Sequence, residues 1–588
     1  MKFLKNKIIS SIFLFVFLVS CSSSEPREAK VSKDIVNEEV ITREQSSKPI
    51  EEISTEKPAI EEKVEPAKDT HTSKSDASEK KVVPTEEEIS KEKEVIIPGE
   101  DTSSQERVKE DEISDSKETE DKTEEKPKEI VIDNSFFAEK VDSIFSERGL
   151  NSSHYGIKVV NLSSGETIFE RNEDSSFIPA SNTKLYTGAA AMEILGKDYR
   201  FKTRLAYRGE ISPDGTLNGD LYIIGGGDPT LGSKYLFNRR FNMQSKATPG
   251  RIDTQLAFLD EWADEVKSLG INRVNGKVLV DDSHFNKINT AINTWEWRDM
   301  STSFGAPPSG VNILDNIVLV DFSRDGGTNI TPSTSTVEVI NDTTNSKANK
   351  VTVSAPPYGK SIVAVGEVYT SVSKEVPVPD PGLLLGDLFR KNLEKNGISI
   401  NNGFEVVQTS SHSKVFFTHY SPSLERISVL MNSYSINLYA ETLKLEAEKE
   451  LAKTRPISIS RYWYETLNLQ GFRLYDGSGL SRYSRVTPNN TIELLSYMYS
   501  SEYAEDYYGS LAVAGQRGTF QDFNKPPLRN NLHGKSGTLT GVKSYSGYIT
   551  NSNDELLAFS IMVNLHGLTN YQITAKLEEI MSEMYKLQ

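Results

Sequence analysis

The stretch FIPASNTKLYTGAAAMEILG at residues 177–196 decides how the rest of the chain is interpreted. Its pattern predicts a helix that begins at Ser181 and ends at Gly196, because a polar N-cap and a terminal glycine are common helix boundaries. Gly188 and the three alanines that follow it give this helix almost no side-chain bulk. Neighbouring elements can approach such a helix closely on every side, so we expect it to be central and buried.

Ser181 and Lys184 lie three residues apart and therefore share one face of this helix. A serine at a helix N-terminus sits where backbone N–H groups and the helix dipole favour negative charge. A buried lysine one turn further on is driven toward its neutral form, which can accept a proton. The pair could act as nucleophile and base, although the same spacing also occurs at Ser54–Lys57 and Ser90–Lys93. An N-cap beside a solvated lysine is the alternative interpretation of such a pair.

Two further motifs carry polar groups that suit the same chemistry. In LMNSYSINLYAE, residues 430–441, Ser435 and Asn437 lie on a predicted loop before a helix, so a proton-relaying hydroxyl and an amide can point into one cleft. In GKSGT, residues 534–538, Lys535 supplies a fixed cation beside hydroxyl groups. Strands are predicted to follow at 545–550 and 556–563. A cation and a hydroxyl on a strand edge suit the carboxylate of a bound peptide.

The order Ser-x-x-Lys, Ser-x-Asn and Lys-Thr/Ser-Gly resembles the motif set of penicillin-binding proteins and serine β-lactamases. Ile436 occupies the middle of the second motif, and Ser536 stands where threonine is usual, which keeps the hydroxyl. The 250 residues between Lys184 and Ser435 exceed what a compact β-lactamase-like domain needs. Such an insert is similar to that of class C low-molecular-mass penicillin-binding proteins, which are D-alanyl-D-alanine carboxypeptidases/endopeptidases with two nested extra domains. Residues 217–222, 225–231, 276–282, 295–308, 476–482 and 514–519 also resemble this family.

The resemblance implies a role in acyl transfer for each motif residue. Ser181 would attack the D-Ala–D-X carbonyl with Lys184 as the base, although the sequence leaves open whether another group acts as that base. Ser435 would carry a proton to the leaving amine, and Asn437 would hold the substrate amide. Lys535 would supply positive charge. The residues expected to bind the substrate along the strand edge, the terminal carboxylate included, are Ser536, Gly537 and Thr538. The N–H groups of Ser181 and Thr538 would form the oxyanion hole.

Three residues outside these motifs are candidates for substrate choice. By resemblance, Asp299 and Phe304 would hold the amine at the side-chain end of diaminopimelate, and Arg482 would hold the carboxylate of the same group. The alternative is structural: Asp299 caps a turn, and Arg482 pairs with Asp476 on the surface. The sequence does not decide between diaminopimelate and lysine at the third position of the stem peptide.

The expected fold class is α/β: a penicillin-binding, serine β-lactamase-like catalytic domain, interrupted by a nested α/β insert that carries a small all-β domain. A helix is predicted at 135–146, a hairpin at 155–160 and 166–170, and an amphipathic helix at 383–397. The expected divisions are a lipoprotein signal peptide (1–20), a disordered acidic tether (21–133), the catalytic domain (134–205 and 411–588), the insert (206–316 and 369–410) and the small β domain (317–368).

The N-terminus has the layout of a secretory signal, with Lys2, Lys5 and Lys7 before an apolar run at 8–19. It ends in LVSC, which resembles a bacterial lipobox, and Cys21 is the only cysteine of the chain. We therefore expect a protein lipid-anchored at Cys21 on the periplasmic side of a membrane. The outer membrane is favoured, because residue 22 is not the aspartate that retains enteric-type lipoproteins at the inner membrane.

Charge is concentrated in residues 22–133, which hold 19 Lys and Arg, 34 Asp and Glu, and no aromatic residue. This composition predicts disorder, with a solvated single helix as the alternative, because little apolar surface can be buried there. The remaining chain is nearly neutral, so nucleic acid is not an expected partner. The seven histidines show no metal-ligand spacing, and we expect neither a metal nor another cofactor.

The expected activity is therefore trimming or cleavage of peptidoglycan stem peptides through an acyl-enzyme, with β-lactams as inhibitors. A serine β-lactamase would share the acylation step but would release the acyl group quickly, and the long insert argues against it. An esterase on the same scaffold is a further alternative. A non-catalytic wall-binding lipoprotein is the alternative from another class, and the intact motifs argue against it. The balance between carboxypeptidase and endopeptidase activity stays open at this point.

Overall fold

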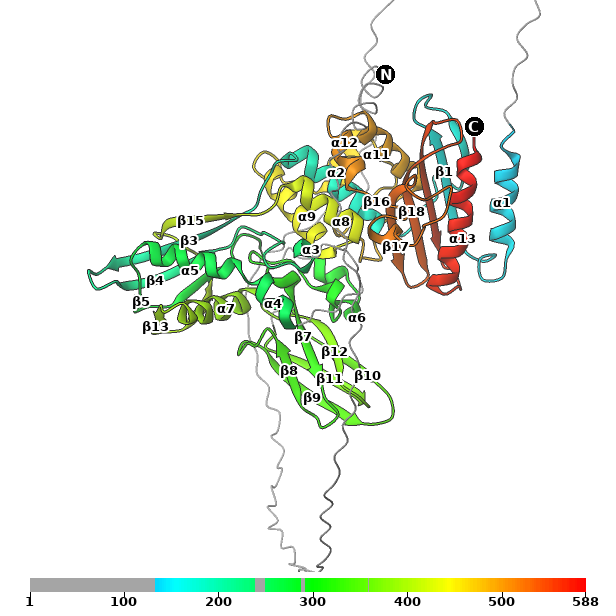
Figure 1. Cartoon of the computed structure of the whole chain (residues 1–588). Helices are drawn as coiled ribbons and strands as arrows, with labels where there is room; N and C mark the ends of the chain where they lie inside the picture. The colour runs from blue at the N-terminus through cyan, green and yellow to red at the C-terminus, as the bar shows by residue number, and fades with distance from the viewer. Residues whose placement is uncertain (1–132, 238–248, 287–290, 358) are drawn as a thin grey trace, which may run out of the picture. The chain divides into compact units, whose positions relative to one another are not determined.

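The computed structural model describes residues 133–237, 249–286, 291–357 and 359–588 (Figure 1). The predicted signal peptide, Cys21 and the predicted tether up to residue 132 lie outside the described residues. Within these ranges, no helix is both long enough and apolar enough to cross a membrane.

A six-stranded antiparallel sheet forms the base of the catalytic part, in the order β16-β17-β18-β19-β1-β2. Its strands are β1 (His154–Asn161), β2 (Thr167–Arg171), β16 (Ala512–Val513), β17 (His533–Leu539), β18 (Val542–Thr550) and β19 (Leu556–Asn564). Helices α1 (Ser135–Ser146) and α13 (Asn570–Glu583) share one apolar cluster with the sheet and run beside it in Figure 1. The hairpin and the first helix predicted from the sequence are thus confirmed.

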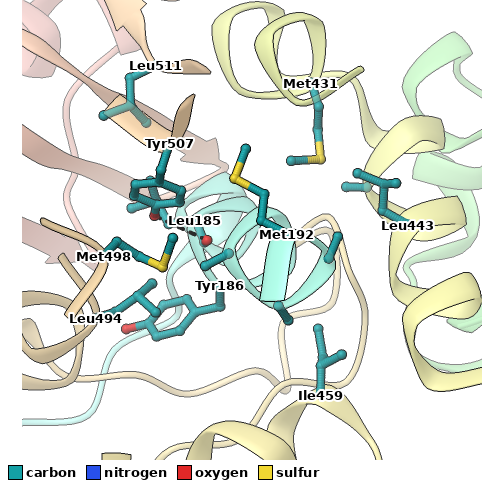
Figure 2. Packing of buried hydrophobic residues seen from close by; sticks show 14 of the residues in the cluster. Leu185, Tyr186, Met192, Met431, Leu443, Ile459, Leu494, Met498, Tyr507 and Leu511 are labelled. Atoms are coloured by element: carbon teal, nitrogen blue, oxygen red, sulfur yellow. Dashed lines mark hydrogen bonds between the residues drawn. The ribbon is translucent and has the colours of Figure 1, made fainter. Parts of the chain in front are cut away.

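A layer of helices packs on the sheet through a second apolar cluster, which includes Tyr548, Ala558 and Met562 of the strands. The layer consists of α2 (Thr183–Leu195), α8 (Leu424–Tyr434), α9 (Asn437–Leu451), α10 (Ile459–Leu467), α11 (Pro488–Ser500) and α12 (Ala504–Ser510). Figure 2 shows α2 surrounded by apolar side chains from the other helices. Every residue of α2 from Thr183 to Met192 is buried, as its small side chains predict.

Ser181 differs in one respect from the prediction, because it does not begin the helix. It lies in a short 3-10 turn, η1 (Ala180–Asn182), and α2 begins two residues later at Thr183. Asn182 Nδ2 donates a 2.8 Å hydrogen bond to Ser546 Oγ of β18 and so ties this turn to the sheet. Ala180 takes a left-handed φ of 47°. The turn is therefore held by tertiary contacts that the local sequence does not reveal.

The insert contains a second, seven-stranded sheet in which β3, β4 and β15 pair antiparallel and the other pairings are parallel. Its strands are β3 (Lys202–Ile211), β4 (Thr216–Ile224), β5 (Arg273–Val274), β6 (Val278–Asp281), β13 (Ser399–Ile400), β14 (Phe404–Val407) and β15 (Lys414–Tyr420). Two helices, α5 (Phe258–Ser268) and α7 (Pro381–Lys395), share its apolar core. The chain enters this sheet at Lys202 and leaves it at Tyr420, so the sheet extends past the boundaries predicted at 205 and 411.

The small β part consists of two three-stranded sheets, β10-β11-β9 and β12-β7-β8. The strands are β7 (Ile317–Phe322), β8 (Thr328–Thr331), β9 (Glu338–Asn345), β10 (Lys350–Ser354), β11 (Ser361–Val368) and β12 (Val372–Pro377). β12 pairs with β7, so these sheets extend beyond residue 368, where the sequence predicts their end. The polar residues between β11 and β12 gave no sign in the sequence that the chain continues into another strand, β12.

Short helical segments complete the described chain. They are α3 (Lys234–Phe237), α4 (Pro249–Gln255), η3 (Ala291–Thr294), α6 (Trp297–Met300), η4 (Ser303–Gly305), η5 (Leu314–Asn316), η6 (Gly518–Phe520) and η7 (Met584–Lys586). Segments α6 and η4 matter most for function, because they belong to the insert and yet line the same cleft as the motifs of the catalytic part.

Candidate active site

The three sequence motifs meet in one cleft of about 510 Å³. Ser181 enters it from the turn before α2, and Thr538 enters it from β17. Ser435 occupies the junction between α8 and α9 with a left-handed φ of 59°, and Asn437 is the first residue of α9. A volume of this size suits a small peptide or a drug-sized ligand.

Lys184 lies at the centre of the site and is completely buried. Its Nζ donates to Ser181 Oγ at 3.0 Å, to Asn437 Oδ1 at 2.6 Å and to the Ser478 carbonyl at 2.7 Å. Burial lowers the pKa of Lys184 to about 7, against the attraction of Asp476 and, less strongly, of Glu441. A substantial fraction of the lysine is therefore neutral near pH 7 and can accept a proton from Ser181.

Two buried carboxylates shape the loop that faces Lys184, and the sequence did not mark either as functional. Glu441 accepts the backbone N–H groups of Gly477 and Ser478, with the shortest distance 2.8 Å. Asp476 accepts N–H groups from Gly479 and Ser481 and from the indole of Trp295. Burial and the nearby Asp476 raise the pKa of Glu441 to about 7. The two acids thus hold the Ser478 carbonyl against the lysine.

A second lysine lies on the other side of the cleft. Lys535 Nζ donates to Ser435 Oγ at 2.9 Å and to the Ser536 carbonyl at 2.7 Å. Burial, followed by repulsion from Lys184 and Lys543, lowers the pKa of Lys535 well below its usual value. The Ser435 hydroxyl is therefore placed next to a group that can give or take a proton.

Strand β17 runs directly against the turn that carries Ser181. A Cβ added at Gly537 would lie 2.7 Å from the Pro179 carbonyl and 3.0 Å from the Ser181 nitrogen, which is closer than side-chain carbons normally approach. Glycine is thus required for this spacing. Thr538 lines the cleft, whereas Ser536 donates to Thr519 Oγ1 at 2.8 Å and is not among the lining residues.

The opposite wall of the cleft is formed by Asp299 and Phe304 of the insert together with Arg482 of the catalytic part. Asn437 Nδ2 donates to the Phe304 carbonyl at 2.8 Å, which joins the insert to the second motif. Asp299 is 9% exposed, and burial followed by repulsion from Glu296 raises its pKa. The ring of Phe304 is 51% exposed, so it is available to a ligand.

Arg482 has a different partner from the one that the sequence suggested. It forms a 2.5 Å ion pair with Glu296 and donates to the Thr540 carbonyl at 3.2 Å. Asp476, the alternative partner, is buried and uses its oxygens on backbone and indole donors. The alternative in which Arg482 pairs with Asp476 is therefore wrong. Arg482 instead lines the cleft wall.

Comparison with known proteins shows the family to which the chain belongs. The model of the D-Ala-D-Ala carboxypeptidase 3 (S13) family matches residues 137–584. The chain belongs to this family. It is 28% identical over 463 residues to a D-alanyl-D-alanine carboxypeptidase of Actinomadura sp. (strain R39), covering 73% of this chain and 81% of that protein. It is 26% identical to a D-alanyl-D-alanine carboxypeptidase of Haemophilus influenzae, covering 70% and 85%.

The fold of this S13 protein also matches a solved structure. The crystal structure of penicillin-binding protein 4 from Haemophilus influenzae aligns with a TM-score of 0.64 at 23% identity, over 76% of this chain and 99% of that one. Together with the family match and the two carboxypeptidase relatives, this confirms the prediction of a class C low-molecular-mass penicillin-binding protein. The predicted α/β fold class is confirmed as well.

The described residues of this S13 protein contain no group of three or more His, Cys, Asp or Glu side chains that could hold a metal ion. The site residues that the sequence missed are charged groups to which it assigned no role in the site. They are Glu296, Glu441, Asp476 and Lys543. Glu441 lies within the second motif stretch, and Glu296 and Asp476 lie within family-like stretches, but nothing in the sequence shows that they are buried or paired in the site.

Proposed function

We propose that the chain is a serine D-alanyl-D-alanine carboxypeptidase/endopeptidase that cleaves peptidoglycan stem peptides through an acyl-enzyme and is acylated by penicillins. The observation that carries the proposal is the 3.0 Å contact between Ser181 Oγ and the buried amine of Lys184. A lysine with its pKa near 7 can activate a serine hydroxyl that it contacts. The family of the chain supports the choice of substrate.

In the acylation step, neutral Lys184 removes the Ser181 hydroxyl proton as Oγ attacks the carbonyl of the penultimate D-alanine. The negative charge that develops on the carbonyl oxygen would be bound by the backbone N–H groups of Ser181 and Thr538. The close approach of β17 to the 3-10 turn supports this pairing of donors. The C–N bond then breaks, and Ser181 keeps the acyl group.

The leaving amine needs a proton, which Ser435 can deliver. Lys535 contacts the Ser435 hydroxyl and can replace the proton that this hydroxyl gives up. Lys184, whose pKa is about 7, then releases to solvent the proton that it took from Ser181, and Lys535 regains one. Water attacks the ester of Ser181 with neutral Lys184 as the base, and Ser181 Oγ takes that proton back as it leaves the acyl group. The side-chain amide of Asn437 would form a hydrogen bond with the substrate amide and so fix the peptide between the two lysines.

The C-terminal carboxylate of the substrate would lie against Thr538 near Lys535. Ser536 would contribute less than Thr538, because its hydroxyl contacts Thr519. On the other wall, Asp299 and Phe304 would bind the amine of a diaminopimelate side chain, with Arg482 at its carboxylate. The three residues line one cleft with Ser181, which supports this assignment.

We also propose that the protein is lipid-anchored at Cys21 on the periplasmic face, in the outer membrane. The support is the LVSC sequence with its single cysteine. Membrane fractionation of Cys21→Ala tests the anchor: this variant should lose membrane attachment or stay an uncleaved precursor. Normal fractionation would reject the proposal.

The function is tested by hydrolysis of a pentapeptide ending in D-Ala-D-Ala, with release of D-alanine as the readout. Ser181→Ala should abolish release and keep the circular dichroism spectrum of the wild type. Ser164→Ala, in the exposed turn of the β1–β2 hairpin, is the matched control and should be fully active. Release of D-alanine by Ser181→Ala would contradict the mechanism. Covalent labelling that the wild type sheds within seconds would favour a β-lactamase instead.

A further inference from the structure

A third buried lysine lies behind the carboxylate end of the cleft. Lys543 belongs to β18 and pairs directly with Thr538 of β17. Its Nζ donates to Thr538 Oγ1 at 3.0 Å and to Asn570 Oδ1, at the start of α13, at 2.9 Å. Lys543 is 4% exposed and is not among the residues that line the cleft, whereas Thr538 and Asn570 are.

The charge of Lys543 has no carboxylate partner among the residues that the structure describes. Burial alone lowers its pKa, to about 8, and no nearby acid opposes this shift. The titratable groups around it are Lys535 of β17, His566 before α13, and Tyr545, whose ring centroid lies 5.1 Å from Nζ. Lys543 and Lys535 thus place two uncompensated amines at the end of the cleft where an anion is expected.

We propose that Lys543 is a positioning residue that keeps the Thr538 hydroxyl oriented as a hydrogen-bond donor toward the C-terminal carboxylate of the substrate. An ammonium group can only donate, so Thr538 Oγ1 must accept from Lys543. The single proton of the hydroxyl is then left for an acceptor on the cleft side. The inference rests on the proposed function, because it needs a substrate that ends in a carboxylate.

The same geometry makes carboxylate recognition depend on pH. When Lys543 loses its proton, its amine becomes an acceptor, and the Thr538 hydroxyl can turn to donate to it. The donor is then withdrawn from the cleft. Recognition of a carboxylate should therefore be complete below about pH 7 and should weaken as the pH rises through about 8.

Lys184 and Lys535 also titrate, so the test compares two peptides that differ only at the C-terminus. One ends in D-Ala-D-Ala with a free carboxylate, and the other ends in the primary amide. The measured quantity is the ratio of their kcat/KM values at pH 6 to 9. Changes at Lys184 affect both peptides alike and cancel in this ratio, whereas loss of a donor to the carboxylate does not.

For the wild type, the carboxylate-to-amide ratio should fall between pH 7 and pH 9. Lys543→Met should lower the ratio at pH 7 by about tenfold or more, mainly through KM, which is the usual effect of losing a hydrogen bond to a charged group. Its ratio should fall less between pH 7 and pH 9 than that of the wild type, because Lys535 is then the only one of the two lysines left to change its charge near the carboxylate. Lys543→Arg keeps a donor that stays protonated, so its ratio should stay high up to pH 9.

Lys158→Met is the matched control, because Lys158 is a partly buried lysine of β1 in the same sheet that contacts Asn489 and Glu170. Its ratio should equal that of the wild type. An unchanged ratio in Lys543→Met, with the wild type active, would overturn the role of Lys543 and leave the proposed function intact. A lowered ratio that falls with pH as steeply as that of the wild type would also overturn it. A wild type inactive on both peptides would overturn the proposed function itself.

Discussion

Replacing Asp476 with asparagine should move the pH dependence of Ser181 acylation to lower pH. The negative charge of Asp476 is the largest influence that opposes the effect of burial on the pKa of Lys184. Asparagine keeps the shape of the side chain and removes this charge. The buried amine should then lose its proton more readily, and its pKa should fall below about 7.

The size of the pKa shift of Lys184 depends on the lost charge of Asp476 and on the response of the neighbouring Glu441. Removing a nearby opposite charge typically changes a pKa by about one to three units. Asp476 also raises the pKa of Glu441, so its loss leaves Glu441 more ionised and restores part of the attraction. We therefore expect a shift of about one unit, which is about 1.4 kcal/mol. At pH 6, the neutral fraction of Lys184 should rise from about 10% to about 50%.

The assay is the rate of acylation by a fluorescent penicillin between pH 5 and pH 9, with each rate divided by the plateau of the same variant. Asparagine cannot accept every N–H group that Asp476 accepts, so the plateau and the melting temperature should fall as well. Those losses do not move the midpoint of the normalised acylation rate plotted against pH. Asp387→Asn, which removes another buried carboxylate in α7 of the insert, should leave the midpoint unchanged. A midpoint in Asp476→Asn that is unchanged or higher would refute Lys184 as the base.

Two further substitutions test the walls of the cleft. Asp299→Ala should lower kcat/KM by about 30-fold or more on peptides that carry free diaminopimelate, because a desolvated charge pair contributes about 2–4 kcal/mol. It should change the rate of penicillin acylation little. Equal losses on the peptide and the penicillin would make Asp299 a structural residue. Gly537→Ala should slow acylation by about 100-fold in a folded protein, because its Cβ displaces the turn of Ser181. Gly509→Ala, where the Cβ meets open space, is its control, and equal rates in the two variants would show that this spacing is unimportant.

The sequence predicted the parts of the site that depend on short spacings. The spacing of Ser181 and Lys184 predicts their contact, although Ser181 lies in the 3-10 turn η1 and not on α2 itself. The small residues of α2 predict its burial. The meeting of the three motifs came from resemblance to a family, since 250 residues separate Lys184 from Ser435.

Interactions between distant segments could not be predicted in the same way. Glu441 and Asp476 are buried carboxylates, and acidic residues are rarely buried without partners, so their sequence gives no sign of that position. The pairing of Arg482 with Glu296 joins the catalytic part to the insert across a large separation in sequence. Lys543 is one charged residue in a strand, and only the register of β17 and β18 brings it to Thr538.

The most direct test of the whole account is to identify the residue that a penicillin modifies. The full-length protein is incubated with the drug, digested, and its peptides are analysed by mass spectrometry. We expect one added mass on Ser181, equal to that of the intact penicillin, because opening of the β-lactam ring releases no fragment. An adduct on any other residue, or none on an otherwise folded protein, would contradict the claim that Ser181 is the nucleophile.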